Sequence, residues 1–224
     1  MEAQLKAFLE DVDLPAKDIH DIDLEAQGLT DITDSDLKFL AQFTHCINLN
    51  LGENEIRKIS GPFPALSQLA MLDLRENQLG SDVLGCLSRL TGLEVLMLTH
   101  NSIKTLDKFA ALKPLTKLHF LGLEGNPVAD SVADYRQKIF ALLPDLQVID
   151  FVDRHGTALE RPGASDAGSD DETPVDLAAF YNQDPLLLLS DEDDDEYEQG
   201  SDESEDDDED EEEEPPVKKA KTSK

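Results

Sequence analysis

Apolar residues recur at fixed intervals along the first two thirds of the chain. Each copy of the pattern has apolar residues at positions 1, 4, 6 and 11, and four copies have Asn at position 9. These Asn positions are 54, 77, 101 and 126, which are 23, 24 and 25 residues apart. Such a period is typical of an architecture built from stacked repeats. The five copies are Ile19, Ile22, Leu24, Gln27, Leu29; Cys46, Leu49, Leu51, Asn54, Ile56; Leu69, Leu72, Leu74, Asn77, Leu79; Leu93, Leu96, Leu98, Asn101, Ile103; and Leu118, Leu121, Leu123, Asn126, Val128.

The spacing within each copy predicts a short strand that ends in a sharp turn. The paired apolar residues alternate along a strand, so both point inward. The Asn amide can bond backbone groups that the turn leaves unpaired. We therefore predict an α/β leucine-rich-repeat solenoid, with a curved parallel sheet on its concave face and a helical or irregular convex side. The predicted convex anchors are Ile59, Phe63, Leu66, Leu84, Leu87, Leu90, Leu106, Phe109, Leu112 and Leu115.

The ends of such a stack need caps, and both flanks contain candidates. Residues 1–15 predict a helical N-terminal cap, and residues 130–154 a C-terminal cap. In the latter, Asp134 is expected to cap a helix from Tyr135 to about Leu143, which Pro144 ends. We expect one capped domain of about five repeats over residues 1–154, followed by a disordered acidic tail over residues 155–224. The apolar cap residues are Leu5, Phe8, Leu9 and Val12 at one end, and Leu146, Val148, Ile149 and Phe151, forming a last strand, at the other.

The positions between the inward residues face the concave side, which is the usual recognition surface of such solenoids. The early repeats place acidic residues there, whereas Met71, Val95, Met97 and Phe120 form a predicted exposed apolar patch that marks a partner site. The alternative is that these side chains shield one another or that the sheet twist separates them. The predicted partner-binding residues are Asp21, Asp23, Glu25, Asn48, Asn50, Met71, Asp73, Arg75, Val95, Met97, His100, Phe120 and Glu124.

Charge changes this picture by indicating the class of partner. The chain has a formal net charge of −31, and residues 155–224 contain 26 acidic and 5 basic residues. So acidic a segment buries too little apolar surface to offset the entropy of ordering its backbone. The balance also argues against direct binding of nucleic acid and favours basic protein partners, such as histones or RNA-binding proteins.

The acidic tail contains two apolar islands, residues 175–181 and 185–189. One interpretation is that they fold on a partner, and the other is that they dock on the repeat domain of the same chain. Asp195, Glu196 and Tyr197 combine acid and aromatic character in a pattern that suits a histone surface, although a Tyr can also lie in such a tail by chance.

Further candidate signals in the tail are short. Ser169, Ser190 and Ser204 each precede an acid by three residues, which is the spacing of an acid-directed phosphorylation site. Lys218, Lys219 and Lys221 suggest nuclear localisation, or a basic end that folds onto the acidic run. Leu5, Phe8, Val12 and Leu14 fit a loose export spacing, which cap packing explains equally well.

No motif indicates an enzyme. The five histidines have no paired metal-ligand spacing, and the sequence contains no phosphate-binding Gly loop or nucleophile elbow. We expect no catalytic residues, no metal, no cofactor and no membrane interaction, and we expect a monomer. Cys46 and Cys86 are interpreted as reduced core residues.

The chain resembles the acidic leucine-rich nuclear phosphoprotein family. The cap match comprises Tyr135-Arg136, residues 142–146, Ile149-Asp150 and Asp153-Arg154, and the tail match comprises ten consecutive acids at 205–214 followed by Lys218-Lys219-Ala220-Lys221. The resemblance implies a nuclear protein, and we expect it to shuttle to the cytoplasm. It also implies that the protein inhibits protein phosphatase 2A, masks histone tails from acetylation, chaperones histones and bridges RNA-binding proteins to export.

A second resemblance is to the A-prime subunit of the U2 spliceosomal particle. It covers residues 54–58, 98–102, 126–128 and 148–151. This alternative implies a scaffold that binds an RNA-recognition domain through its concave face. The run of ten acids favours the first family.

Overall fold

The structure of the chain is a computed structural model that describes residues 1–12 and 14–159. A number of the predictions fall on later residues and lie outside the described part. They are the acidic tail itself, the islands at 175–181 and 185–189, the motif Asp195, Glu196, Tyr197, the candidate phosphorylation sites Ser169, Ser190 and Ser204, and Lys218, Lys219 and Lys221.

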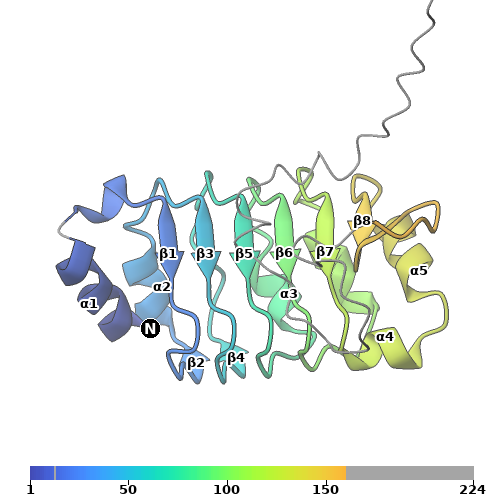
Figure 1. The fold of residues 1–224 in the computed structure, drawn as a ribbon, viewed down its shortest axis with the longest axis horizontal. Coiled ribbons are helices and arrows are strands. Elements are labelled where there is room, and N and C mark those ends of the chain that lie inside the picture. Colours follow the sequence, from blue (N-terminus) through green and yellow to red (C-terminus); the bar gives the residue numbers. More distant parts are fainter. Residues whose placement is uncertain (13, 160–224) are drawn as a thin grey trace, which may run out of the picture. The chain divides into compact units, whose positions relative to one another are not determined.

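Short strands follow one another through the described residues and pair into one sheet (Figure 1). The sheet order is β1 (Asp21–Asp23), β3 (Asn48–Asn50), β5 (Met71–Asp73), β6 (Val95–Met97), β7 (Phe120–Gly122), β8 (Val148–Ile149) and β9 (Val152–Asp153). All pairs are parallel except β8 with β9. A second, two-stranded parallel sheet joins β2 (Asp31–Ile32) and β4 (Lys58–Ile59).

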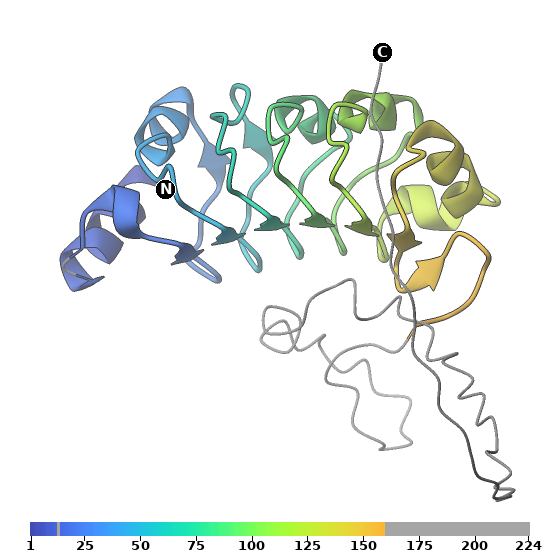
Figure 2. The same ribbon diagram turned by 90° about the horizontal axis from the view of Figure 1, so that it is seen from above.

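Helical segments flank the strands, and those between β1 and β7 lie on one side of the main sheet (Figure 2). They are α2 (Asp34–Leu40), α3 (Val83–Cys86) and the 3₁₀ helix η2 (Asp107–Leu112) between strands, with α1 (Glu2–Val12) and η1 (Ala16–Asp18) before β1, and α4 (Pro127–Ser131) and α5 (Tyr135–Leu142) before β8. The architecture is the predicted leucine-rich-repeat solenoid. We call the sheet face on the other side, away from α2 and α3, the concave face.

The main core lies between the sheet and the helical side. The central residue of each long strand is buried there in register with its neighbours, because Leu49, Leu72 and Leu96 repeat the same slot. The predicted convex anchors close this core from the other side. All are buried apart from Leu106, which is partly buried and packs against the same cluster.

A ladder of Asn side chains runs through the turns that follow the strands. Asn77 Oδ1 accepts a hydrogen bond from the backbone N–H of Ile56 at 2.9 Å, and its Nδ2 donates to the carbonyls of Leu51 and Leu74. Asn54, Asn101 and Asn126 repeat this pattern one unit apart. The predicted role of the repeated Asn is confirmed, because these buried backbone groups would otherwise lack partners.

The N-terminal cap is a helix that packs its first half on α2. Leu5 of α1 is fully buried, whereas Val12, the last residue of the helix, is 38% exposed. The expectation that Val12 packs in the cap is therefore wrong, because the buried contact of α1 is centred nearer its start. Thr33 and Asp36 form a capping box at the start of α2, and Asp36 also accepts the backbone N–H of Glu2 at 2.6 Å.

The C-terminal cap differs from its prediction at the start of α5. Asp134 precedes the helix with φ +56° and makes no side-chain capping hydrogen bond, so its predicted capping role is wrong. A capping residue has an extended backbone that brings its side chain to the free N–H groups, and a left-handed backbone does not. The helix starts at Tyr135 and ends at Leu142, in agreement with the predicted range from Tyr135 to about Leu143.

Beyond α5 the apolar residues are buried as expected, but the last strand is shorter. Val148 and Ile149 form β8, and Asp150 and Phe151 then turn the chain with φ values of +52° and +58°. Backbone hydrogen bonds continue past residue 154, because Leu159 N–H donates to the Phe151 carbonyl at 2.8 Å.

The candidate partner-binding face

Strand register arranges the concave side chains in two rows. The first row runs Asp21, Asn48, Met71, Val95, Phe120, Val148, and the second runs Asp23, Asn50, Asp73, Met97, Gly122. Both rows change from polar to apolar near β5. We call Asp21, Asp23, Glu25, Asn48, Asn50, Glu53, Asp73 and Arg75 the polar half. We call Met71, Val95, Met97, Phe120, Val148 and Phe151 the apolar half.

Arg75 organises the polar half by reaching across one strand to the next. Its Nη2 lies 3.0 Å from Glu25 Oε1 and 3.8 Å from Glu53 Oε1, and its Nε lies 3.4 Å from Asp73 Oδ2. The side chain follows the backbone at Gly52, where an added Cβ would lie 3.2 Å from Arg75 Cγ. Glycine at this position therefore leaves room for a single cation to contact three carboxylates.

Amide side chains link the remaining carboxylates of the polar half. Asn48 Nδ2 donates to Asp21 Oδ1 at 2.6 Å, and Asn50 Nδ2 donates to Glu25 Oε2 at 2.7 Å. Asn50 Oδ1 accepts the backbone N–H of Gly52 at 2.9 Å. These bonds hold the carboxylates in place on the first two strands of the sheet.

The carboxylates of the polar half titrate differently. Burial raises the pKa of Asp73 to about 6, although the Arg75 backbone N–H and guanidinium oppose the change. Burial also acts to raise the pKa of Glu25, but hydrogen bonds from Asn50 and Glu53 and the charge of Arg75 outweigh it, so that pKa is lowered. The pKa of Glu53 is raised, chiefly by its hydrogen bond with Glu25. Of these three carboxyl groups, Glu25 is the one whose pKa is lowered, so the polar half keeps negative charge at neutral pH.

The apolar half is a second hydrophobic cluster, separate from the main core on the other side of the sheet. Phe120 packs edge-on against Phe151, with ring centroids 5.0 Å apart. Phe120 and Met97 are each 1% exposed. The prediction of an exposed patch is therefore wrong for Met71, Val95, Met97 and Phe120.

Neighbouring strands explain part of this burial. Side chains on strands about 5 Å apart cover one another, and the turn after β8 places Phe151 over Phe120. Mutual shielding, which was the alternative interpretation, agrees better with the structure. Val148 and Phe151 are assigned to the cap by the sequence pattern, which did not predict their place on this face. The slot that Val148 shares with Phe120 was the signal that could have found it.

Two further predicted partner-binding residues, His100 and Glu124, lie in turns rather than on strands. His100 follows β6 with φ +53°, and its ring lies against Gly125, where an added Cβ would be 2.3 Å from Nδ1. Glu124 follows β7 and is exposed, and its carbonyl accepts the His100 N–H at 2.7 Å. His100 is therefore positioned by packing in its turn, at the rim of the predicted face.

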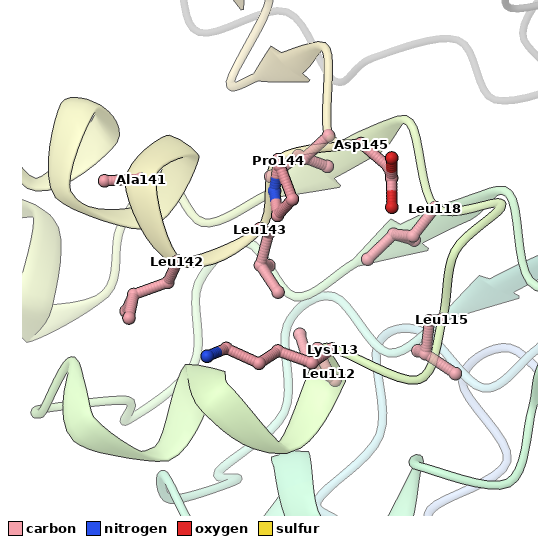
Figure 3. A pocket seen from close by; sticks show the side chains of 10 residues that line it. Leu112, Lys113, Leu115, Leu118, Ala141, Leu142, Leu143, Pro144 and Asp145 are labelled. Carbon is pink, nitrogen blue, oxygen red and sulfur yellow. The ribbon is translucent and has the colours of Figure 1, made fainter.

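One hollow beside the C-terminal cap lies on the other side of the sheet. It has a volume of about 340 Å³, and Leu112, Lys113, Leu142 and Leu143 line it between η2 and the end of α5 (Figure 3). Eight of its ten lining residues have apolar side chains, and Lys113 and Asp145 are the charged ones. Such a lining offers no arranged acid, base or nucleophile.

The other candidate features of residues 1–12 and 14–159 are their two thiols, possible metal ligands and possible membrane-spanning helices. Cys46 and Cys86 are free thiols, and burial raises the pKa of both, that of Cys46 to about 12. Across the same residues, no group of three His, Cys, Asp or Glu side chains is placed to hold a metal ion. None of the helices there is long and apolar enough to cross a membrane.

Comparisons with known proteins agree with this fold and with the first resemblance. A family profile described as leucine-rich repeat matches residues 19–166. Acidic leucine-rich nuclear phosphoprotein 32-related protein 1 of Caenorhabditis elegans is 36% identical over 114 residues, which are 49% of this chain and 48% of that protein. A probable U2 small nuclear ribonucleoprotein A' of the same organism is 33% identical over 103 residues, 46% of this chain and 40% of that protein.

A solved structure extends the comparison to the fold. A chain in the Drosophila melanogaster SNF/U2A' complex aligns with a TM-score of 0.50 at 24% identity, covering 59% of this chain and 73% of that one. The chain spans about half the length, or less, of the two curated relatives described above. The profile match covers well over half of the sequence. The chain therefore belongs to the leucine-rich-repeat family, and acidic leucine-rich nuclear phosphoprotein 32-related proteins are among its relatives.

Proposed function

We propose that this chain is a non-enzymatic nuclear adaptor that binds basic proteins, with histones as the first partners to test. The observation that supports it most directly is the carboxylate excess of the polar half. Arg75 is the cation there, and Glu25, Glu53 and Asp73 already surround it. Asp21 and Asp23 are exposed beside them. An incoming Lys or Arg would therefore find carboxylates whose positions the sheet has already set.

The sequence beyond the described residues supports the same class of partner. Residues 155–224 contain 26 acidic and 5 basic residues, so they attract positive charge over a longer range than the polar half does. In this proposal the acidic segment increases the rate of encounter, and the polar half selects the arrangement of basic side chains. The motif at Asp195, Glu196 and Tyr197 and phosphorylation of Ser169, Ser190 and Ser204 would strengthen the attraction.

Binding of purified core histones to the full chain tests the proposal. Asp21→Asn, Asp23→Asn and Glu53→Gln together should weaken binding severalfold, because three exposed or partly exposed carboxylates lose their charge. The control is Glu10→Gln, Asp11→Asn and Asp18→Asn, which makes the same charge change at exposed positions of α1 and η1. Equal binding by the two triple variants would refute a role for the polar half.

A separate variant addresses the acidic run. Replacing the acids at 205–214 by their amides should reduce both the association rate and the salt dependence of binding. Unchanged salt dependence would contradict the steering role. Replacing Lys218, Lys219 and Lys221 by Ala tests the nuclear part of the proposal, since the variant should lose nuclear accumulation in cells.

Inhibition of protein phosphatase 2A belongs to this proposal through the resemblance alone. Its test is direct: the purified phosphatase is assayed with the full chain and with both triple variants. Inhibition that disappears in the polar-half variant and persists in the control would place this activity on the same surface. No inhibition by the full chain would remove it from the proposal.

A second candidate function is a scaffold for an RNA-recognition domain, as implied by the second resemblance. The relative named as a probable U2 small nuclear ribonucleoprotein A' and the apolar half support it. Met97→Glu should then abolish co-purification with a U2 particle protein, whereas amide replacement at 205–214 should not. A melting curve of the variant shows that its fold persists. Histone binding by the wild type, with no U2 particle protein recovered, would favour the adaptor.

A further inference from the structure

The apolar half is buried more deeply than the outer face of a single sheet usually is. Its six side chains are between 1% and 5% exposed, although the main core lies on the opposite side of the same strands. Side chains on one face shield each other laterally, but their tips point away from the sheet. The tips of these side chains are therefore the part of the cluster that a docked segment would contact.

The course of the chain leads directly to this surface. After β9, Asp153 N–H donates to the Thr157 carbonyl and Leu159 N–H donates to the Phe151 carbonyl, so the backbone folds back over the end of the sheet. Leu159 packs against the apolar half and is the last residue that the structure describes. The 65 residues that follow therefore begin at this patch.

Among residues 160–224, composition favours one segment, residues 175–189, as the one that contacts the apolar half. Residues 160–174 and 190–214 are rich in acids and would be repelled by the neighbouring polar half. Residues 175–189 contain two acids, Asp176 and Asp184, together with Phe180, Tyr181 and the four leucines at 186–189. This stretch alone in the remainder offers enough hydrocarbon to cover a cluster of six apolar side chains.

Distance permits the contact. The 15 residues at 160–174 can span roughly 50 Å when extended. The row from Met71 to Val148 crosses three strand spacings, or about 15 Å. The intervening chain is thus several times longer than the surface it must reach across, and loop closure of this length costs little more than that of a shorter loop.

We propose that residues 175–189 dock on the apolar half of their own chain and occupy it in the absence of a partner. The segment acts as a built-in competitor: a protein that uses the apolar half must displace it. This inference concerns the apolar half, whereas the adaptor proposal rests on the polar half and the acidic run, so either can fail without the other.

Methionine methyl signals offer a sparse test in the full chain, because the sequence has three Met residues, Met1, Met71 and Met97. With ¹³C-methyl methionine, the triple variant Phe180→Asp, Leu187→Asp, Leu188→Asp should shift the signals of Met71 and Met97 and leave that of Met1 in place. These substitutions lie outside the repeats. If residues 175–189 do not dock, the substitutions should therefore leave the fold of the described residues unchanged. Unmoved Met71 and Met97 signals would overturn the proposal.

A matched control separates docking from charge. Ala164→Asp, Ala167→Asp and Gly200→Asp add the same three charges outside residues 175–189 and should leave all three signals unchanged. Dilution distinguishes a second copy of the chain as the occupant. Signals that move on dilution in the wild type would overturn the intramolecular contact, and signals independent of concentration support it.

A tryptophan reporter gives an independent measurement, because the sequence contains no Trp. Phe180→Trp in the full chain should fluoresce with blue-shifted emission and resist quenching by acrylamide. The same Trp should become red-shifted and severalfold more quenchable when Met97→Glu is added, with the fold checked by far-UV circular dichroism. Solvent-like emission in the Phe180→Trp chain itself would contradict the proposal.

Discussion

Asn48 and Phe120 occupy the same slot of two strands in one sheet, but their surroundings differ completely. Asn48 is half-buried and donates to a carboxylate, whereas Phe120 is 1% exposed and packs against another aromatic ring. The backbone frame is common to both, so the difference comes from side chains alone. A repeat fold can therefore place an electrostatic surface and a hydrophobic surface side by side without changing its backbone.

The two halves also differ in how they are held together. The polar half depends on directional contacts between charged and amide groups, which contribute modestly and respond to pH and salt. The apolar half depends on buried area, which is insensitive to both. A substitution in one half should therefore change the free energy of unfolding by a different amount from one in the other half, and the change should depend differently on pH and salt.

The largest effect is expected in the apolar half. Phe120→Ala should lower the free energy of unfolding by about 3–5 kcal/mol, because it leaves a cavity among buried side chains. Asn48→Ala at the matched slot should cost about 1 kcal/mol, the usual value of one hydrogen bond. Urea denaturation of the full chain measures both. Equal losses would show that the two halves are not held differently.

A smaller effect is expected from removing the cation of the polar half. Arg75→Met should cost about 2–3 kcal/mol at pH 7, because it leaves the buried Asp73 carboxylate without a charged partner. The loss should shrink at pH 5, where Asp73 takes up a proton. Adding Asp73→Asn to the variant should recover part of the stability, and a loss that is the same at both pH values would contradict the pairing.

Titration of Asp73 should produce an effect of about 2 kcal/mol. Its pKa is raised by burial to about 6 from the ordinary 3.8, so between these values the folded state binds more protons than the unfolded state. The contribution of Asp73 to stability is therefore most favourable below about pH 4 and falls as pH rises to 6. The variant Asp73→Asn should lack this fall, so its stability relative to the wild type should rise across that window. Parallel pH profiles of the two proteins would exclude the raised pKa.

The smallest effects are expected at two glycines, Gly52 beside the polar half and Gly122 beside the apolar half. Gly52→Ala would place a Cβ 3.2 Å from Arg75 Cγ, and Gly122→Ala would place one 3.2 Å from Met97 Sδ. Both neighbours are flexible side chains, so each variant should cost about 1 kcal/mol, at the low end for overpacking. Gly122→Ala should also shift the Met97 methyl signal, whereas Gly52→Ala should not. A Met97 shift in both variants would mean that the halves are coupled.

Much of the architecture could be predicted because each repeat repeats its own local pattern. The Leu and Asn spacing predicted the strands, the turns and the side on which Leu72 and Leu96 lie. Nine of the thirteen predicted concave residues lie on the strands, since alternation along a strand follows from backbone geometry. The other four, Glu25, Arg75, His100 and Glu124, lie beyond the strand ends. Residue spacing cannot predict what covers a face, and Met97 and Phe120 were therefore expected to be exposed.

The caps show the same limit on a smaller scale. Asp134 is a favourable capping residue by type, but its left-handed backbone prevents that role, and backbone conformation at one turn depends on the packing around it. Arg75 was assigned to the concave face by its slot. Its side chain passes over Gly52 and reaches Glu25, fifty residues earlier in the chain. This contact depends on the order of the strands in the sheet.

The amino-acid sequence by itself thus determined the repeat period, the inward leucines, the Asn ladder and the acidic character of the chain, because these follow from local spacing and composition. Tertiary structure alone decided the burial of the apolar half, the placement of Val148 and Phe151 on it, and the grouping of three carboxylates around Arg75. The physical reason is that stacking joins residues more than twenty positions apart, and both burial and charge pairing depend on those distant neighbours.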